Sequence, residues 1–445
     1  MVTLFGTDGV RGVVNATLLP ELAYQLGRAA GSYFSGIAGV HRFLVGRDTR
    51  ISGTMIEAAL AAGLCASGIN VDIVGVIPTP GVSYEVVDGG FDCGVMITAS
   101  HNPYTDNGIK LVNNDGYKME EDILEQVEDY IDHKFELPLA TENAIGCTVD
   151  YMQGRNRYIA HLIASANFSL QGVKVGLDCA NGAASSVAKP VFDALGADVR
   201  VINNSPNGFN INVDAGSTHI EVLQRHVVEQ GLDVGFAYDG DADRCIAVDD
   251  RGRVVDGDLI LYVCAKYLNK HGRLAGGTVV PTVMSNFGLF KALDVAKVAY
   301  EKTDVGDKNV FACMRAHGYS LGGEQSGHVI FGDIENTGDG IMTSLRVMEV
   351  IRAEHETLSE LVRPVSLYPQ QLDNIRVANK QAAMESCEVK AAVAAAEKFL
   401  KGNGRVLVRA SGTEPLVRVL SEAPDEKLCR DANAIVIAAL EPFKA

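Results

Sequence analysis

Three times along the chain, a short apolar run that predicts a buried strand ends in a polar loop with reactive side chains. These loops contain Ser100, Asp239 and Glu324, and each belongs to a segment of similar length in which strand and helix patterns alternate. The residues themselves show little self-similarity, so the repeat is one of architecture rather than of motif. Alternating strands and helices predict α/β domains, whose sheets place reactive groups at strand ends.

The last part of the chain has a different pattern, and we predict four domains in all. Their boundaries are placed at 1–148, 149–255, 256–366 and 367–445. In the last domain we expect strands at 372–377, 405–409 and 416–420 and helices at 382–400 and 425–440. Elsewhere we expect Pro78-Thr79-Pro80 to break the chain and residues 297–300 to form a strand.

The composition excludes several classes of function. A net charge of −17 over 445 residues predicts no general affinity for nucleic acid or for an anionic membrane. The nine cysteines contain no Cys-x-x-Cys pair, which argues against a structural zinc site and favours reduced thiols. With no signal-peptide pattern and no apolar run of membrane-spanning length, we expect a cytoplasmic protein.

The first polar loop carries a candidate nucleophile. Ser100 and His101 follow the apolar run Val95–Ile97 and precede Pro103, which cannot continue a central strand. Taken alone, this segment is better interpreted as an ordinary Ser/Asn-rich turn. The functional interpretation depends on the other loops.

The second loop, Asp239-Gly240-Asp241-Ala242-Asp243-Arg244, predicts a cation site. Three carboxylates at alternate positions converge when the chain curls, and oxygen ligands of this kind suit Mg²⁺. The alternative is an acidic surface turn, but three aspartates at the end of a buried strand would repel one another without a cation. An EF-hand is excluded because the loop glycine and terminal glutamate are absent.

Two further groups of residues have the chemistry to bind a phosphosugar. Glu324 and Ser326 have side chains that hydrogen-bond hydroxyls, and His328 titrates near neutral pH. In the last domain, Arg409 and Arg418 flank a Ser411-Gly412-Thr413 turn, which predicts a cradle for an oxyanion the size of phosphate. The alternatives are a structural histidine and a hairpin with solvated arginines. Together the four loops predict phosphoryl transfer on a phosphosugar.

The chain resembles the bacterial phosphoglucosamine mutases, a branch of the α-D-phosphohexomutase superfamily. The resemblance rests on five segments in the family's order, which span nearly the whole chain: Phe5–Gly12, Thr98–Lys110, Asp239–Arg244, Gly322–His328 and Arg409–Arg418. It implies three related α/β mixed-sheet domains and a C-terminal TBP-like α+β domain, arranged as a heart around a central active-site cleft.

The resemblance also implies roles for individual residues. Ser100 would be a phosphoserine that binds Mg²⁺ together with Asp239, Asp241 and Asp243. The residues of the reacting centre would be Arg11, His101, Lys110, Arg244 and His328, with the general base and acid left open between Lys110 and His328. The sugar would contact Glu324 and Ser326, and its distal phosphate would contact Arg409, Ser411, Gly412, Thr413 and Arg418.

The reaction implied by the resemblance interconverts glucosamine 6-phosphate and glucosamine 1-phosphate. Phosphoserine 100 donates its phosphoryl group to the free hydroxyl, and a 1,6-bisphosphate of glucosamine or glucose serves as intermediate or activator. The product would feed UDP-N-acetylglucosamine and cell-wall synthesis. A homodimer is compatible with the resemblance. We expect Arg at position 308 from the family, but this chain has Lys there. Lys keeps the positive charge but lacks the two-pronged guanidinium, so the substrate contacts of this loop are not assigned.

Three other functions compete with this one. The nearest is a phosphomannomutase or phosphoglucomutase of the same superfamily, because no single residue of the sequence identifies the amino group of the sugar. An aspartate-nucleophile phosphatase would use Asp239 instead of Ser100. A non-catalytic phosphosugar sensor would need neither nucleophile.

Overall fold

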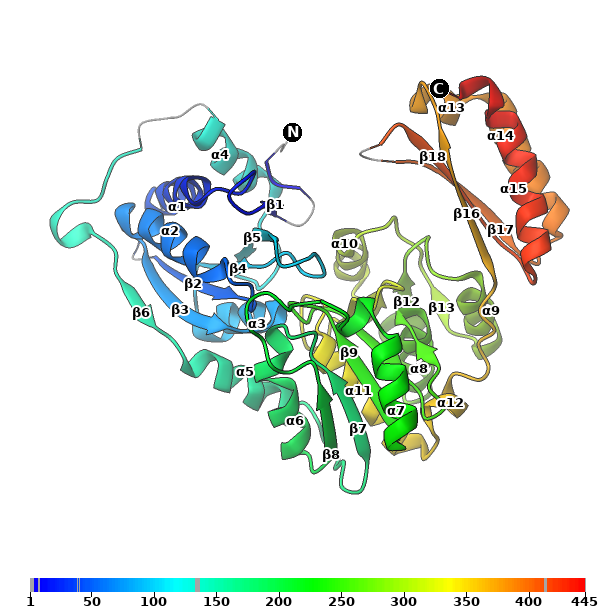
Figure 1. Ribbon diagram of the computed structural model, residues 1–445, viewed down its shortest axis with the longest axis horizontal. Coiled ribbons are helices and arrows are strands. Elements are labelled where there is room, and N and C mark those ends of the chain that lie inside the picture. Colours follow the sequence, from blue (N-terminus) through cyan, green and yellow to red (C-terminus); the bar gives the residue numbers. More distant parts are fainter. Residues whose placement is uncertain are drawn as a thin grey trace. The chain divides into compact units, whose positions relative to one another are not determined.

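The structure is a computed structural model that describes residues 4–6, 9–37, 39, 41–132, 137–411 and 414–444. The chain forms two compact units (Figure 1). One unit contains Met1–Met284 and Val298–Val362, and the other contains Ser285–Lys297 and Arg363–Ala445. No helix in the described residues is long and apolar enough to cross a lipid bilayer.

The first sheet of the first unit has six strands in the order β1-β5-β4-β2-β3-β6. Strand β4 is buried along its whole length and pairs parallel with β2 and antiparallel with β5, as its continuous apolar sequence predicts for a central strand. The strands are β1 (Val10–Val13), β2 (Arg42–Arg47), β3 (Asn70–Val76), β4 (Cys93–Ile97), β5 (Asp106–Asn113) and β6 (Thr148–Asp150). The helices are α1 (Pro20–Ser35), α2 (Gly53–Ala66), α3 (Thr79–Gly89) and α4 (Glu121–Asp132).

The second sheet has five strands in the order β11-β10-β9-β7-β8. Its central strand β9 is fully buried and turns into β10 through the Asp239–Arg244 loop, with the two strands antiparallel. The strands are β7 (Lys174–Asp178), β8 (Asp198–Ile202), β9 (Val234–Tyr238), β10 (Cys245–Val248) and β11 (Val254–Val255). The helices that accompany them are α5 (Gln153–Ala164), α6 (Ala188–Ala194) and α7 (Glu221–Gln230).

The third sheet has four strands in the order β13-β12-β14-β15. Its antiparallel hairpin β14–β15 carries the Glu324–His328 loop. The strands are β12 (Thr278–Pro281), β13 (Ala299–Tyr300), β14 (Leu321–Gly323) and β15 (Val329–Phe331). The helices are α8 (Gly257–Lys270), α10 (Asp307–His317), α11 (Gly340–Glu354) and α12 (Leu358–Leu361).

The second unit is built on a three-stranded antiparallel sheet in the order β16-β18-β17. Its core consists of apolar side chains from these strands and from the helices that follow them. The strands are β16 (Gln370–Arg376), β17 (Arg405–Ala410) and β18 (Leu416–Glu422), and the helices are α9 (Phe287–Ala296), α13 (Lys380–Glu385), α14 (Cys387–Leu400) and α15 (Glu426–Leu440). Helix α9 therefore belongs to the second unit although it precedes β13 in the sequence.

Three local predictions are wrong. The Pro78-Thr79-Pro80 segment starts helix α3, because proline is tolerated in a first turn where its missing N–H has no helical partner. The helix expected at 382–400 is two helices, since the Ser386 hydroxyl accepts the amides of Glu388 and Val389 and caps α14. Lys297 caps α9 in the left-handed conformation, so β13 begins only at Ala299.

The predicted fold class is confirmed for the individual sheets and the helices that flank them. Three mixed sheets flanked by helices precede an antiparallel sheet with helices, as expected for three α/β domains and an α+β domain. The four domain boundaries and the heart-shaped arrangement around a cleft stay predictions.

Candidate active site

The Ser100 loop is held by a buried arginine. Arg50 is 1 % exposed, and its guanidinium donates hydrogen bonds to the carbonyl oxygens of Ser100 (2.8 Å), Asn102 (2.9 Å) and Asp106 (3.0 Å) and to that of Pro103. Its Nε pairs with the buried Asp48 carboxylate at 2.8 Å. Strands β2 and β4 are parallel neighbours, so the segment after β2 lies under the loop after β4.

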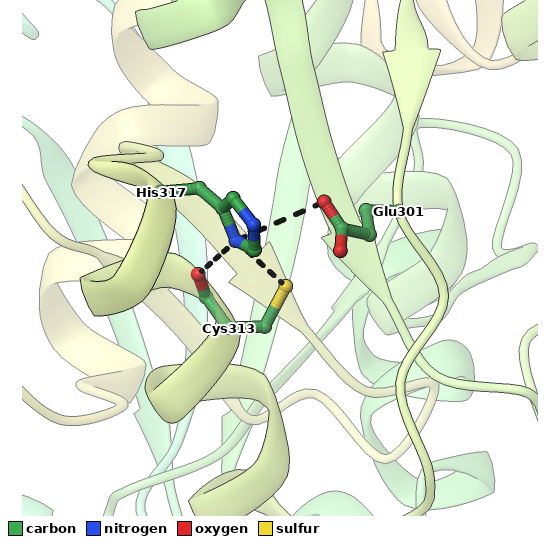
Figure 2. A group of neighbouring side chains, drawn as sticks. All are labelled: Glu301, Cys313 and His317. Carbon is green, nitrogen blue, oxygen red and sulfur yellow. Dashed lines mark hydrogen bonds and ion pairs between the residues drawn. The ribbon is translucent and has the colours of Figure 1, made fainter.

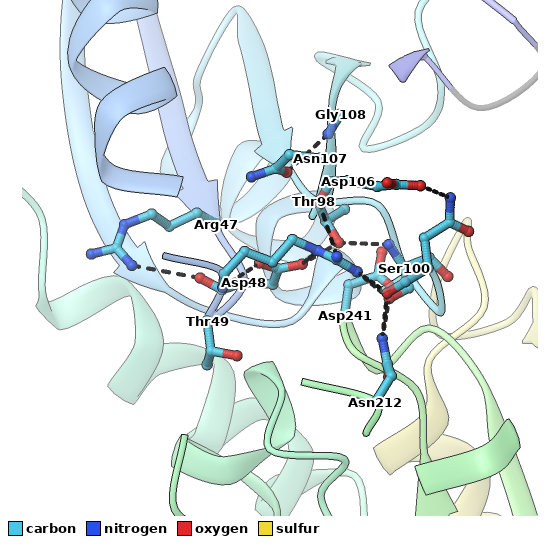
Figure 3. A network of polar contacts seen from close by, with 12 residues as sticks. Arg47, Asp48, Thr49, Thr98, Ser100, Asp106, Asn107, Gly108, Asn212 and Asp241 are labelled. Carbon is cyan, nitrogen blue, oxygen red and sulfur yellow. Dashed lines mark hydrogen bonds and ion pairs between the residues drawn. The ribbon is translucent and has the colours of Figure 1, made fainter. Parts of the chain in front are cut away.

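The conformation of Ser100 is strained. Its φ is +51°, a conformation that costs free energy for a residue with a Cβ. The Thr98 hydroxyl accepts the Ser100 amide at 2.9 Å, and the Asn212 side-chain amide donates to the carbonyls of Ser100 (2.8 Å) and Asn102 (3.1 Å). Figure 3 shows this network around Ser100. The surrounding hydrogen bonds therefore enforce the strained position.

The Ser100 hydroxyl faces the three aspartates. Its Oγ donates to Asp239 Oδ2 at 2.7 Å, although the two residues are 139 positions apart in the chain. A Cβ at Gly240 would lie 2.5 Å from the Ser100 carbonyl oxygen, so only glycine lets the two loops approach this closely. The structure thus brings the predicted nucleophile and the predicted cation site together.

The three carboxylates fit a bound cation. Asp239, Asp241 and Asp243 are buried, and one oxygen of each lies within 4.8 Å of those of the other two. Oδ1 of Asp241 and Oδ1 of Asp243 are buried and have no hydrogen-bond partner among the described residues. Buried carboxylate oxygens without partners are costly unless a cation satisfies them.

The pKa values of Asp239 and Asp243 are shifted in opposite directions. Burial and the charges of Asp243 and Asp241 raise the pKa of Asp239 well above its usual range. Burial would also raise the pKa of Asp243, but the close contact with His328 and the positive charges of Lys110 and Arg244 hold it well below its usual range. Negative charges this close together raise the pKa of a carboxyl group, as they do for Asp239, and a divalent cation would offset their repulsion.

Lys110 is part of the same cluster. Its Nζ lies 3.1 Å from Asp241 Oδ2, which also accepts a hydrogen bond from the Thr79 hydroxyl at 2.6 Å. Thr79 is in the first turn of α3, so the incorrect prediction of a chain break there concealed this contact.

The His101 imidazole lies between the Ser100 hydroxyl and a guanidinium group. His101 Nδ1 is 3.3 Å from Ser100 Oγ and 3.3 Å from Arg244 Nη1. Burial together with the charges of Arg244 and Arg11 lowers the pKa of His101, which keeps this imidazole neutral near pH 7. Arg11, in β1, is thereby placed near the same centre. These guanidinium groups have the chemistry to stabilise a phosphoryl group.

His328 is buried next to Asp243. Its Nδ1 is 3.6 Å from Asp243 Oδ2, and its Nε2 accepts a hydrogen bond from the Gly338 amide at 3.2 Å. Burial lowers the pKa of His328, but the close contact with Asp243 and the charges of Asp243 and Asp307 outweigh it and raise that pKa. Asp307, 3.9 Å away, is a neighbour that the sequence patterns did not reveal.

The remaining predicted residues lie in two places. Glu324 is half-buried and accepts the Gly306 amide at 2.9 Å, while Ser326 is exposed in the same loop. In the second unit, Arg409 and Arg418 are cross-strand partners, Arg418 lies 3.7 Å from Glu414, and Lys380 donates to the Ser411 carbonyl at 2.6 Å. Gly412 and Thr413 lie outside the described residues.

Sequence patterns missed the residues that support the site. Asp48, Arg50, Thr79 and Asn212 hold the loops in place, but none of them belongs to the motifs above. Asp48 and Arg50 do carry one usable signal, because they follow a buried strand directly, as Ser100 does.

A serine hydroxyl directed at buried carboxylates that fit a cation, in an α/β fold, is characteristic of metal-assisted phosphoryl-transfer enzymes. Four family models match consecutive parts of the chain. They describe phosphoglucomutase/phosphomannomutase α/β/α domain I (residues 2–137), domain II (156–252), domain III (256–368) and the C-terminal domain (372–438). The chain therefore belongs to the phosphoglucomutase/phosphomannomutase family, and the resemblance to this superfamily is confirmed.

Individual relatives agree with this assignment. The chain is 54 % identical over 435 residues to a phosphoglucosamine mutase of Lachnoclostridium phytofermentans, covering 97 % of both chains. A crystal structure of a phosphoglucomutase/phosphomannomutase family protein from Burkholderia thailandensis has the same fold, with a TM-score of 0.79, 24 % identity and coverage of 99 % and 98 %. An Aspergillus fumigatus N-acetylphosphoglucosamine mutase, solved with GlcNAc-6P and magnesium, has a TM-score of 0.70 at 19 % identity, covering 100 % and 96 %.

Proposed function

We propose that this enzyme interconverts glucosamine 6-phosphate and glucosamine 1-phosphate through a phosphoserine at position 100. The observation that carries the proposal is the 2.7 Å contact between Ser100 Oγ and Asp239 inside the carboxylate cluster. It is supported by relatives about half identical over nearly their full length that are named phosphoglucosamine mutases.

In the first half-reaction, the bond between phosphorus and Ser100 Oγ breaks, and a bond forms between phosphorus and the free sugar hydroxyl. The proton of the sugar hydroxyl passes to Ser100 Oγ. In the second half-reaction the other phosphoryl group moves to Ser100 Oγ, and the Oγ proton passes to the sugar oxygen that this group leaves. Arg244 and Arg11 would balance charge on the transferring group. Asp239, Asp241 and Asp243 would hold Mg²⁺, which supplies charge neutralisation when bound.

Lys110 is our candidate for proton transfer, with His328 as a positioning residue. Both ring nitrogens of His328 face groups of the protein, namely Asp243 and the Gly338 amide. Lys110 instead contacts Asp241 through a flexible side chain whose three donors can rotate.

The other predicted contacts complete the proposal. Glu324 and Ser326 would bind sugar hydroxyls, and Arg409, Ser411, Gly412, Thr413 and Arg418 would bind the phosphate that does not react. Glucose or glucosamine 1,6-bisphosphate would act as activator. We further propose a cytoplasmic location, a supply of product to UDP-N-acetylglucosamine and cell-wall synthesis, and a homodimer.

The nucleophile is tested by intact mass and peptide mapping of the purified enzyme. We expect one added phosphoryl group, on Ser100, and it should survive acid. Ser100→Ala should lose nearly all activity while it largely retains sugar-phosphate binding. Hydroxylamine-labile phosphate on Asp239 would indicate an aspartyl phosphatase instead, and full function of Ser100→Ala would indicate a sensor.

Substrate preference is tested separately. The values of kcat/KM for glucosamine 6-phosphate, glucose 6-phosphate and mannose 6-phosphate should be highest for the amino sugar. A preference for mannose or glucose would make the enzyme a phosphomannomutase or phosphoglucomutase of the same family, without affecting the phosphoserine mechanism.

A further inference from the structure

A second group of metal-binding side chains lies in the third sheet region, and the proposed reaction does not use it. Glu301 directly follows β13, and Cys313 and His317 lie one turn apart on α10 (Figure 2). All three are at least partly accessible to solvent, with Glu301 and His317 about half exposed. Within the described residues, only this group and the Asp239 cluster bring three such ligand atoms together.

The spacing of these ligand atoms is close to that of a tetrahedral site. His317 Nδ1 lies 3.9 Å from Cys313 Sγ and 3.9 Å from Glu301 Oε2, and all three atoms lie within 4.8 Å of one another. Zinc–sulfur and zinc–nitrogen bond lengths place such ligands roughly 3.5 Å apart. For the two pairs that include His317, side-chain movements of a few tenths of an ångström would therefore suffice.

Helix α10 brings the side chains of Cys313 and His317 together. Residues at positions i and i+4 share one face of an α-helix, so Cys313 and His317 point to the same side. The Tyr319 ring stacks on His317 with a centroid distance of 5.2 Å and an interplanar angle of 17°, which restricts the orientation of the imidazole. Cysteine spacing alone does not reveal such a site, because only one of its ligands is a cysteine.

The chemistry of the ligands differs from that of the Asp239 cluster. A thiolate and an imidazole prefer borderline-soft ions such as Zn²⁺ or Co²⁺, whereas three carboxylates suit Mg²⁺.

We propose that Glu301, Cys313 and His317 bind a divalent transition-metal ion of the Zn²⁺ class, with water as the fourth ligand. The Cys313 thiol proton leaves to solvent when the sulfur–metal bond forms. His317 Nδ1, which donates a proton to the Cys313 carbonyl at 3.1 Å, gives up that hydrogen bond, and the imidazole proton moves to Nε2. The ion joins the end of β13 to the last turns of α10, across the loop that contains Gly306.

Co²⁺ is the probe that distinguishes this site from the Asp239 cluster. The full-length enzyme, stripped with chelator and kept reduced without added thiols, is titrated with Co²⁺ in saturating Mg²⁺. Only a site with a cysteine ligand gives a thiolate-to-cobalt charge-transfer band in the near ultraviolet. We expect this band to saturate at one equivalent and to disappear when Zn²⁺ is added.

Variants identify the ligands. Cys313→Ala should lose the band, and His317→Ala and Glu301→Gln should weaken Co²⁺ binding by roughly tenfold or more. Cys387→Ser, which removes an exposed cysteine elsewhere, and Ser100→Ala should both retain the wild-type titration. The proposal is overturned if wild type shows no band, if Cys313→Ala retains it, or if neither His317→Ala nor Glu301→Gln changes the affinity.

Discussion

At the scale of single residues, the position of Ser100 depends on a side chain that never touches its hydroxyl. Arg50 binds four carbonyl oxygens of the loop and balances the buried charge of Asp48. A guanidinium can make all of these hydrogen bonds because its five donors have a fixed geometry, whereas an ammonium group cannot.

Arg50→Lys should therefore lower kcat by about 100-fold while KM changes little, because a displacement of about 1 Å at the reacting centre has effects of this size. The charge that balances Asp48 is retained. Steady-state kinetics and the fraction of phosphorylated Ser100, measured by intact mass, check the prediction. Arg42→Lys is the matched control, since Arg42 pairs with Asp72 in the same sheet at 2.6 Å. A wild-type kcat in Arg50→Lys would show that the loop does not need this arginine.

A second residue-scale effect concerns pH. The Glu335 side chain is 8 % exposed, and burial raises its pKa from 4.5 to about 7. Between these two values the folded protein holds a proton that the unfolded chain has released, so the free energy of unfolding falls as the pH rises. Glu335→Gln should remove this decline, which amounts to about 3 kcal/mol for one group with such a shift.

Urea unfolding of wild type and Glu335→Gln between pH 5 and 8 measures this effect. The variant should gain stability relative to wild type as the pH rises. Glu397→Gln, which changes an exposed carboxyl, should leave the pH profile unaltered. Parallel curves for wild type and Glu335→Gln would contradict the assignment.

At the scale of elements, a serine divides one predicted helix into two. Ser386 is extended, with φ −56° and ψ 132°, and its hydroxyl accepts the amides of Glu388 (3.1 Å) and Val389 (3.3 Å). Ser386→Ala should destabilise the second unit by about 1 kcal/mol, and Ser386→Asp should restore most of this. Thermal unfolding of the three proteins tests the cap, and an unchanged midpoint in Ser386→Ala would argue against it.

The individual strands and helices show what the sequence could and could not predict. Strands such as Val234–Tyr238 were predictable because their apolar runs are continuous and bounded by polar loops. The predictions at Ser386 and Pro80 were wrong because the same residue types can interrupt a helix or start one, and only the neighbouring amides decide which. The motifs located Ser100 and the three aspartates, whereas Arg50 and Asn212 act on backbone carbonyls, a contact that no motif records, and for Arg50 the one signal was its place after a buried strand.

At the scale of the whole molecule, the chain consists of two compact units, so heating should give two calorimetric transitions. Helix α9 is tied to the C-terminal sheet, since the Phe287 amide donates to Glu422 at 3.0 Å and Arg405 donates to the Ser285 carbonyl. Arg405 also pairs with the fully buried Glu422 carboxylate.

Arg405→Met should lower the transition of the second unit by about 3–5 kcal/mol in unfolding free energy, because it leaves the Glu422 charge buried without its partner. The transition of the first unit should stay in place. Arg430→Met, which removes an exposed pair with Glu426, should have little effect on either transition. If Arg405→Met shifted both transitions equally, the two units would not be thermodynamically separate.

Finally, the hydrogen bonds that hold the Ser100 loop have an evolutionary consequence. Arg50 and Asn212 bind the loop only through main-chain oxygens, which every amino acid provides. An exposed side chain such as that of Tyr104 can therefore be exchanged without releasing the nucleophile. The loop is evolvable in this sense: selection can adjust what the enzyme accepts while the position of the reacting serine is inherited unchanged.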